Sequence, residues 1–193
     1  MSATNTPLLL ADYLLWGNAL ACFGQAPTFD LTKTIGTPVS FPQDVAVDQA
    51  GFMYLLDGPG ITKLAPNGDL VQSIVLQNYR GGGFGMGIDR AGNLYVGNYT
   101  YSRVEKYSPT GTLLLQFGSM GSGPGQFRYM NSLTVDAAGN LYATNRDHHG
   151  NSKLRKYDPS GTLLNKWGNL ASLGPLAIDA VGNTTVLTCG RAR

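Results

Sequence analysis

The fold is decided by the stretch Asp136-Ala137-Ala138-Gly139-Asn140-Leu141-Tyr142, whose pattern occurs four times in the chain. In each copy a short alternating apolar run enters the Asp, and a second run leaves the Gly. The Asp opens a turn because its side chain bonds to the backbone that follows, and the Gly closes the turn at a positive φ. Asp-x-x-Gly between two alternating runs therefore predicts a β-hairpin. The other copies are DQAGFMY at 48–54, DRAGNLY at 89–95 and DAVGNTT at 179–185.

A second turn, Pro-x-Gly, follows three of these hairpins, at residues 66–68, 109–111 and 159–161. Each repeat therefore contains two hairpins in series, which makes four strands, a to d. The repeated Asp recurs after 41, 47 and 43 residues. A period of roughly 40 to 50 residues with four short strands is typical of a β-propeller blade. No window has a sustained 3.6-residue apolar period, which argues against helical and βαβ architectures.

These segments resemble the NHL repeat family of β-propellers. Blades of that family begin with a pattern such as P-x-G-I-A-V-D, continue through G-N-L-Y-V and N-x-R-V, and end in L-x-x-F-G. The resemblance runs from about residue 29 to the C-terminus, and it implies an all-β propeller without implying one function. The matching segments are PQDVAVD at 42–48, GNLYV at 92–96, SRV at 102–104 and LLLQFG at 113–118.

We expect one propeller domain with about four blades' worth of four-stranded antiparallel repeats. The expected parts are a partial leading blade with strands b to d at 1–40, blades at 41–80, 81–127 and 128–173, and a partial trailing blade with strands a and b at 174–193. Closed propellers typically have four to eight blades. The chain is therefore a fragment of a longer, six-bladed propeller, a small closed ring, or half of an assembly with a second copy. We favour the fragment.

The composition is that of a folded domain, with 42% hydrophobic and 13% charged residues among 193. The two cysteines, Cys22 and Cys189, are expected to be buried thiols. An apolar run at 8–21 resembles a signal peptide, but no basic residue precedes Lys33 and Asp12 interrupts the run. The same Asp argues against a membrane span. The compartment stays open, because an exported or cell-surface bacterial protein is suggested only by analogy with the family.

Two sets of polar residues recur in register. Lys63, Lys106 and Lys156 are expected to be solvated strand positions whose stems cover apolar surface. The ends of the b strands carry a polar column that is expected to cap the strands and to bond neighbouring loop amides. The members of this column are Asp12, Asp57, Asn98, Asn145 and Thr188.

The loops of a propeller leave two faces. The Asp-x-x-Gly and Pro-x-Gly turns, which join strands a to b and c to d, form one face, which we call the turn face. The loops joining b to c and d to a form the other, the loop face, where long variable loops on a rigid scaffold usually carry binding residues. The predicted ligand-binding residues on the loop face are Tyr79, Arg80, Tyr99, Tyr101, Arg103, Arg128, Tyr129, Arg146, His148 and His149.

Interleaved Tyr and Arg predict a function in recognition, because both are enriched as anchors of protein interfaces. We expect a non-enzymatic recognition or scaffold module that binds a protein or peptide. The same residues suit single-stranded nucleic acid, but a net charge of +2 is small for a polyanion partner. A glycan ligand and self-association through open blade edges are further alternatives. The competing class is an enzyme fragment, a lyase or lactonase-like hydrolase whose metal ligands lie in missing blades.

Catalytic and metal-binding patterns are not found in the sequence, so no catalytic residue, metal or cofactor is expected. Some NHL-like lyases hold zinc with three histidines, whereas His148 and His149 are adjacent and their side chains point apart in an extended segment. The glycine-rich run at 81–87 lacks the Lys and Ser or Thr of a phosphate-binding loop. We expect this run to allow a tight backbone turn, with Met86 and Ile88 packed between blades.

Overall fold

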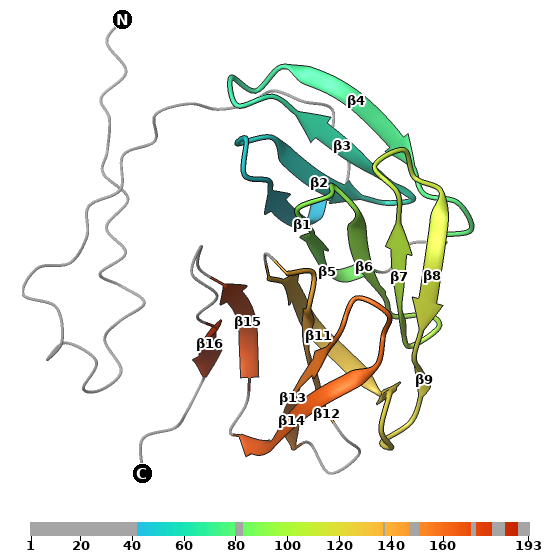
Figure 1. Ribbon diagram of the computed structural model, residues 1–193, viewed down its shortest axis with the longest axis vertical. Coiled ribbons are helices and arrows are strands. Elements are labelled where there is room, and N and C mark those ends of the chain that lie inside the picture. The colour runs from blue at the N-terminus through green and yellow to red at the C-terminus, as the bar shows by residue number, and fades with distance from the viewer. Residues whose placement is uncertain are drawn as a thin grey trace, which may run out of the picture. The chain divides into compact units, whose positions relative to one another are not determined.

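Every regular element in the described part of the chain is a β-strand, which confirms the expected all-β fold class (Figure 1). This described part contains no helix that is long and apolar enough to span a bilayer. The predicted leading blade at 1–40, Arg80, His148, His149 and both cysteines lie outside the described residues, so the predictions made for them stay predictions. The described residues of this computed structural model are 42–79, 83–136, 138–146, 151–170, 173–178 and 184–188.

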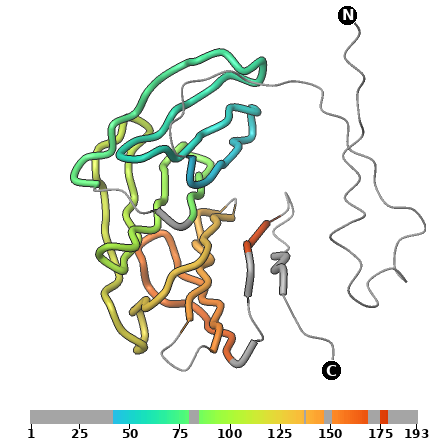
Figure 2. The backbone as a smooth tube through the Cα atoms, turned by 180° about the vertical axis from the view of Figure 1, so that it is seen from behind, coloured from blue at the N-terminus to red at the C-terminus, as the bar shows by residue number. Residues whose placement is uncertain are grey.

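Three four-stranded antiparallel sheets follow one another along the chain, each with its strands in sequence order, and a two-stranded sheet follows them (Figures 1 and 2). The first sheet comprises β1 (Pro42–Val47), β2 (Met53–Asp57), β3 (Gly60–Leu64) and β4 (Leu70–Val75). The second comprises β5 (Gly83–Ile88), β6 (Leu94–Asn98), β7 (Arg103–Tyr107) and β8 (Leu113–Phe117). The third comprises β11 (Tyr129–Val135), β12 (Leu141–Arg146), β13 (Ser152–Tyr157) and β14 (Leu163–Leu170), and the last comprises β15 (Leu173–Ile178) and β16 (Thr184–Thr188).

The repeated Asp forms the turn that the sequence predicts. Asp89 Oδ1 accepts hydrogen bonds from the backbone nitrogens of Ala91 at 3.0 Å and Asn93 at 2.8 Å, and Gly92 has a φ of +80°. The Pro109 ring of the next hairpin lies so close to Gly92 that a Cβ there would be 3.3 Å from it. The first and third sheets repeat this arrangement at Gly51 and Gly139. The two kinds of turn therefore lie together on the turn face.

Neighbouring sheets are held together by apolar cores built from the alternating strand residues. The first core joins the first and second sheets and includes Tyr54, Leu56, Ile74, Leu94 and Tyr107. The second joins the second and third sheets and includes Tyr95, Val104, Phe127, Leu141 and Tyr157. A smaller core joins Tyr142 and Leu154 of the third sheet to Leu176 and Ile178 of β15.

The glycine-rich run lets the first strands of neighbouring sheets approach each other. Gly85 has a φ of +121°, and a Cβ there would lie 2.6 Å from the backbone nitrogen of Leu133 in β11. Met86 is buried beside it, and Ile88 packs against the same core. The expected packing role of this run is therefore confirmed.

The connection between the second and third sheets contains a short parallel pair that the sequence does not predict. Its strands are β9 (Ser119–Met120) and β10 (Gln126–Phe127). Phe127 is fully buried, with its ring centroid 5.5 Å from that of Tyr157. The pair thus fixes a long loop against the third sheet.

Candidate functional site

A hollow on the loop face, between the first and second sheets, brings together three of the predicted binding residues. The described residues that line it are Asn78, Tyr79, Tyr101 and Arg103, and its volume is about 570 Å³. Tyr79 comes from the connection that follows β4, whereas Tyr101 and Arg103 come from the loop between β6 and β7 and from the start of β7. Packing of the two sheets therefore assembles a site from segments more than 20 residues apart in the chain.

Arg103 is held in this hollow from two sides. Its Nε and Nη2 donate to Glu105 Oε1 at 2.7 and 2.6 Å. The guanidinium carbon also lies 4.6 Å from the ring centroid of Tyr101, which is within the range of a cation–π contact. The side chain is 23% exposed, so this fixed guanidinium still reaches solvent.

Glu105 is a buried carboxylate that organises the floor of the site. Its side chain is 1% exposed, and besides Arg103 it accepts from the Tyr107 hydroxyl at 2.7 Å and from Asn98 Nδ2 at 3.3 Å. Burial raises the pKa of Tyr107, and the hydrogen bond to Glu105 raises it further. A buried charge is tolerated when it is paired and hydrogen-bonded in this way. The positive charge of Arg103 is thereby balanced by an adjacent negative charge.

Tyr79 supplies a polar group without a partner. The residue is 6% exposed, yet its hydroxyl makes no hydrogen bond to the described part of the chain. Burial, followed by the negative charge of Glu105, raises the pKa of this phenol above its ordinary value. Tyr79 therefore lines the hollow as a protonated phenol whose buried hydroxyl has no partner in the described part of the chain.

The backbone around the hollow is fixed in two unusual conformations. Asn78 and Ser102 have φ values of 62° and 50°, the left-handed region in which residues other than glycine are uncommon. Ser102 is buried, and Asn98 Oδ1 accepts a hydrogen bond from the Tyr101 backbone nitrogen at 3.2 Å. Asn98 thus caps its strand as expected, and it also positions Tyr101.

The other predicted residues that the structure describes are not among the lining of this hollow. Tyr129 pairs with Arg146 in the β11–β12 ladder, and the Arg128 guanidinium lies 5.8 Å from the Tyr129 ring, so these three gather at the third sheet. Tyr99 is exposed and is not part of the lining of the hollow.

Sequence reasoning missed Glu105 and Tyr107, although a signal was present. Arg103, Glu105 and Tyr107 alternate along one strand, so their side chains share a face. An acidic residue on the core face of a strand needs a partner, and that requirement points to Arg103. The sequence did not show that this face would be covered by the first sheet.

The recurring lysines are not solvated in the way we expected. Lys106 Nζ lies 4.8 Å from the Tyr95 ring centroid and 3.6 Å from Asp89, and Lys156 makes the same contacts with Tyr142 and Asp136. Each of these lysine ammonium groups therefore links the repeated Asp of the turn to the Tyr of the strand that leaves it.

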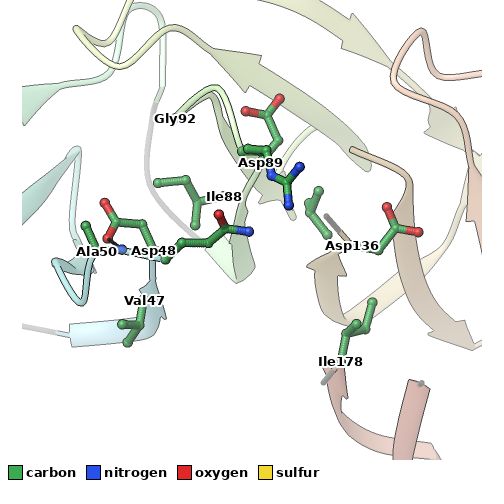
Figure 3. Close-up of a pocket in the computed structure, with 11 residues that line it drawn as sticks. Val47, Asp48, Ala50, Ile88, Asp89, Gly92, Asp136 and Ile178 are labelled. Atoms are coloured by element: carbon green, nitrogen blue, oxygen red, sulfur yellow. Dashed lines mark hydrogen bonds between the residues drawn. The ribbon is translucent and has the colours of Figure 1, made fainter. Parts of the chain in front are cut away.

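A second hollow opens on the turn face where the first strands of the sheets end (Figure 3). Its volume is about 350 Å³, and Asp48, Asp89 and Asp136 lie around it with Ile88 and Ile178. Each of these three carboxylates already accepts hydrogen bonds from its own turn. Among the described residues, no group of three His, Cys, Asp or Glu side chains is placed to hold a metal ion.

No protein-family profile and no curated protein matches the sequence. Solved structures do share its fold: a gluconolactonase of Xanthomonas campestris is 17% identical with a TM-score of 0.57, over 84% of this chain and 59% of that one. A streptogramin B lyase is 14% identical with a TM-score of 0.53, over 86% of this chain and 59% of that one. A chain of a nidogen/laminin complex is 23% identical with a TM-score of 0.55, over 71% of this chain and 52% of that one.

These similarities confirm the β-propeller type of fold and, at such identities, nothing beyond it. The chain spans between about half and three fifths of the length of these structures. The structures include a lactonase and a lyase as well as a propeller in a protein complex. Membership of the NHL family and a six-bladed parent stay predictions.

Proposed function

We propose that the protein is a non-enzymatic recognition module that binds a protein or peptide segment in the loop-face hollow of Tyr79, Tyr101 and Arg103. The observation that carries this proposal is the fixed guanidinium: Arg103 is held by Glu105 and stacked on Tyr101, and yet it reaches solvent. Arg and Tyr anchors in a partly desolvated hollow are the residues that most often dominate the energy of a protein interface.

The charge balance supports a peptide over a nucleic acid. Phosphate binding depends on cations that release counterions, whereas the charge of Arg103 is already compensated by Glu105. The unpaired Tyr79 hydroxyl adds a neutral hydrogen-bond donor at the same place. A backbone carbonyl or a neutral polar side chain of a peptide can accept hydrogen bonds from the Arg103 guanidinium and the Tyr79 hydroxyl without bringing a net charge.

The rigidity of the hollow supports tight binding. Ordering side chains on association costs about 0.5–1.5 kcal/mol for each flexible residue. Here Arg103 and the loop at Tyr101 are already fixed by Glu105 and Asn98, so little of that cost applies.

A second candidate function is enzymatic, because solved structures of the same fold include a gluconolactonase and a streptogramin B lyase. In that case the metal ligands would lie beyond the described residues. The metal content of the full chain, together with hydrolysis of a sugar lactone, separates the two candidates. Stoichiometric zinc or calcium together with turnover would overturn the recognition proposal.

The direct test is selection of peptides from a random displayed library on the immobilised full chain, followed by calorimetric titration of a selected peptide. We expect the Tyr101→Ala, Arg103→Ala variant to weaken binding by about thirtyfold, which corresponds to about 2 kcal/mol. Lys63→Ala is the matched control, because Lys63 also stacks on aromatic rings, at 4.6 Å from Phe52, but on the turn face. Equal binding by all three proteins, with unchanged circular dichroism, would contradict the proposal.

A further inference from the structure

A second loop-face groove lies between the connection at 119–127 and the third sheet. The described residues that form it include Ser122 and Pro124 from the connection and Lys153, Arg155, Leu163 and Lys166 from β13 and β14. Its volume is about 290 Å³, at the lower end of the range for small-molecule sites. It occupies the position in the third sheet that the Tyr79 hollow occupies in the second.

The strand ladders show which residues correspond in the two places. Tyr107 and Tyr157 each pair with the first residue of the b strand in their own sheet, so they occupy equivalent positions. Counting back two and four residues along the strand, Arg155 is equivalent to Glu105, and Lys153 is equivalent to Arg103. The buried negative charge of the second sheet is therefore a buried positive charge in the third. Two cations, Lys153 and Arg155, thus stand at the ladder positions that Arg103 and Glu105 occupy in the second sheet.

Arg155 is positioned without being neutralised. It is 3% exposed, and its guanidinium donates to the backbone carbonyls of Gln126 and Ser122. Within the described ranges no carboxylate forms an ion pair with Arg155, in contrast to Arg103, which is paired with Glu105, and to Lys106 and Lys156, which are paired with turn-face Asp residues. Neutral carbonyls orient a guanidinium, but they leave its charge in place, and a buried charge is costly without a counter-charge.

Lys166 adds a second cation on the same side. It is paired directly across the β13–β14 ladder from Arg155, and cross-strand partners project their side chains to the same face of a sheet. Lys153 precedes Arg155 by two residues and shares that face as well. No Asp or Glu is present among the described residues that line the groove.

We propose that this groove binds a small anion with two negative charges carried on oxygens, such as phosphate or a short dicarboxylate. Arg155 would supply a planar fork whose orientation is already set by two carbonyls, and Lys166 a mobile point charge at the rim. The small volume favours a compact anion over a polymer. This site is independent of the peptide hollow, because it lies between different sheets and uses none of the same side chains.

Tryptophan fluorescence tests the proposal directly. The chain has two tryptophans, Trp16 and Trp167, and Trp167 lines the groove, so a Trp16→Phe variant of the full chain has one reporter at the site. We expect inorganic phosphate or succinate to change the emission saturably at constant ionic strength, and chloride to leave it unchanged. Phosphate alone or succinate alone would support the site and identify which oxyanion it takes.

Lys166→Glu is the informative variant, because Lys166 is exposed and its replacement leaves the buried Arg155 in place. We expect it to weaken anion binding at least about tenfold. Arg90→Glu, which reverses one exposed charge on the turn face in the same way, is the matched control and should bind as before. Absence of a saturable response, or equal losses in both variants, would overturn the proposal. Arg103→Ala should retain anion binding, which separates this site from the peptide hollow.

Discussion

The side-chain contacts of the repeat are the same from sheet to sheet on the turn face and differ from sheet to sheet on the loop face. On the turn face, Asp89 and Asp136 accept hydrogen bonds from equivalent backbone nitrogens and equivalent asparagines, and they form ion pairs with equivalent lysines. On the loop face, one ladder position carries Thr62, Glu105 and Arg155 in successive sheets. The constant face forms the framework of each blade. The variable face is built on that framework, and charge there changes sign without a change of fold.

The largest effect should come from removing the buried carboxylate of the loop face. Glu105→Ala leaves Arg103, Tyr107 and Asn98 without their shared acceptor. We expect the free energy of unfolding to fall by about 3–5 kcal/mol, as for other broken buried ion pairs. Urea unfolding followed by circular dichroism measures it.

Thr62→Ala is the matched control for Glu105→Ala, since Thr62 occupies the same ladder position in the first sheet. Thr62 carries no charge, so its replacement should lower the free energy of unfolding by less than about 1 kcal/mol. Similar losses for the two variants would show that the ion pair with Arg103 adds nothing, and the contrast between the faces would then be weaker than we infer.

The turn face should respond equally at equivalent positions, with a smaller loss. Asp89→Ala and Asp136→Ala each remove an acceptor of two backbone hydrogen bonds and a lysine partner. We expect each to lower the free energy of unfolding by about 2 kcal/mol, because hydrogen bonds to charged groups contribute about 1.5–3 kcal/mol. Denaturant titration of the two variants side by side is the measurement. A difference above about 1 kcal/mol would break the equivalence.

The smallest effect is a dependence on pH. Burial by itself would raise the pKa of Asp136, but hydrogen bonds from Asn140 and Ala138 and the charge of Lys156 outweigh it and hold the pKa below its ordinary value of 3.8. The stabilisation from this carboxylate is therefore complete above the ordinary pKa and is lost as the pH falls through the lowered pKa of the folded state. The stability difference between the wild type and Asp136→Asn should shrink below pH 3.8. A difference that stays constant in unfolding titrations across that range would contradict this account.

Much of the framework could be predicted from local sequence. Asp-x-x-Gly fixes its turn through hydrogen bonds within five residues, as at Asp89 and Asn93, so no knowledge of the rest of the chain was needed. The packing role of Met86 followed from alternation in the same way. The lysines were misread because Lys106 finds its partners, Tyr95 and Asp89, across a ladder and a turn.

The candidate sites were predicted only in part. Tyr79, Tyr101 and Arg103 were chosen for their residue types, and the prediction did not say which of the ten candidates would meet. Their proximity depends on how the first sheet packs on the second. The parallel pair of β9 and β10, which brings the Gln126 carbonyl to Arg155, has no alternating pattern to reveal it.

The sequence by itself determined the four-stranded repeat, its turns and its all-β class, because these depend on contacts between residues close together in the chain. The tertiary structure decided which side chains share a site and whether a charge is balanced. Arg103 is neutralised by Glu105 beneath the first sheet, whereas Arg155 faces backbone carbonyls beneath the second. Burial makes these differences matter for binding, because charges interact more strongly where the surrounding sheets exclude water.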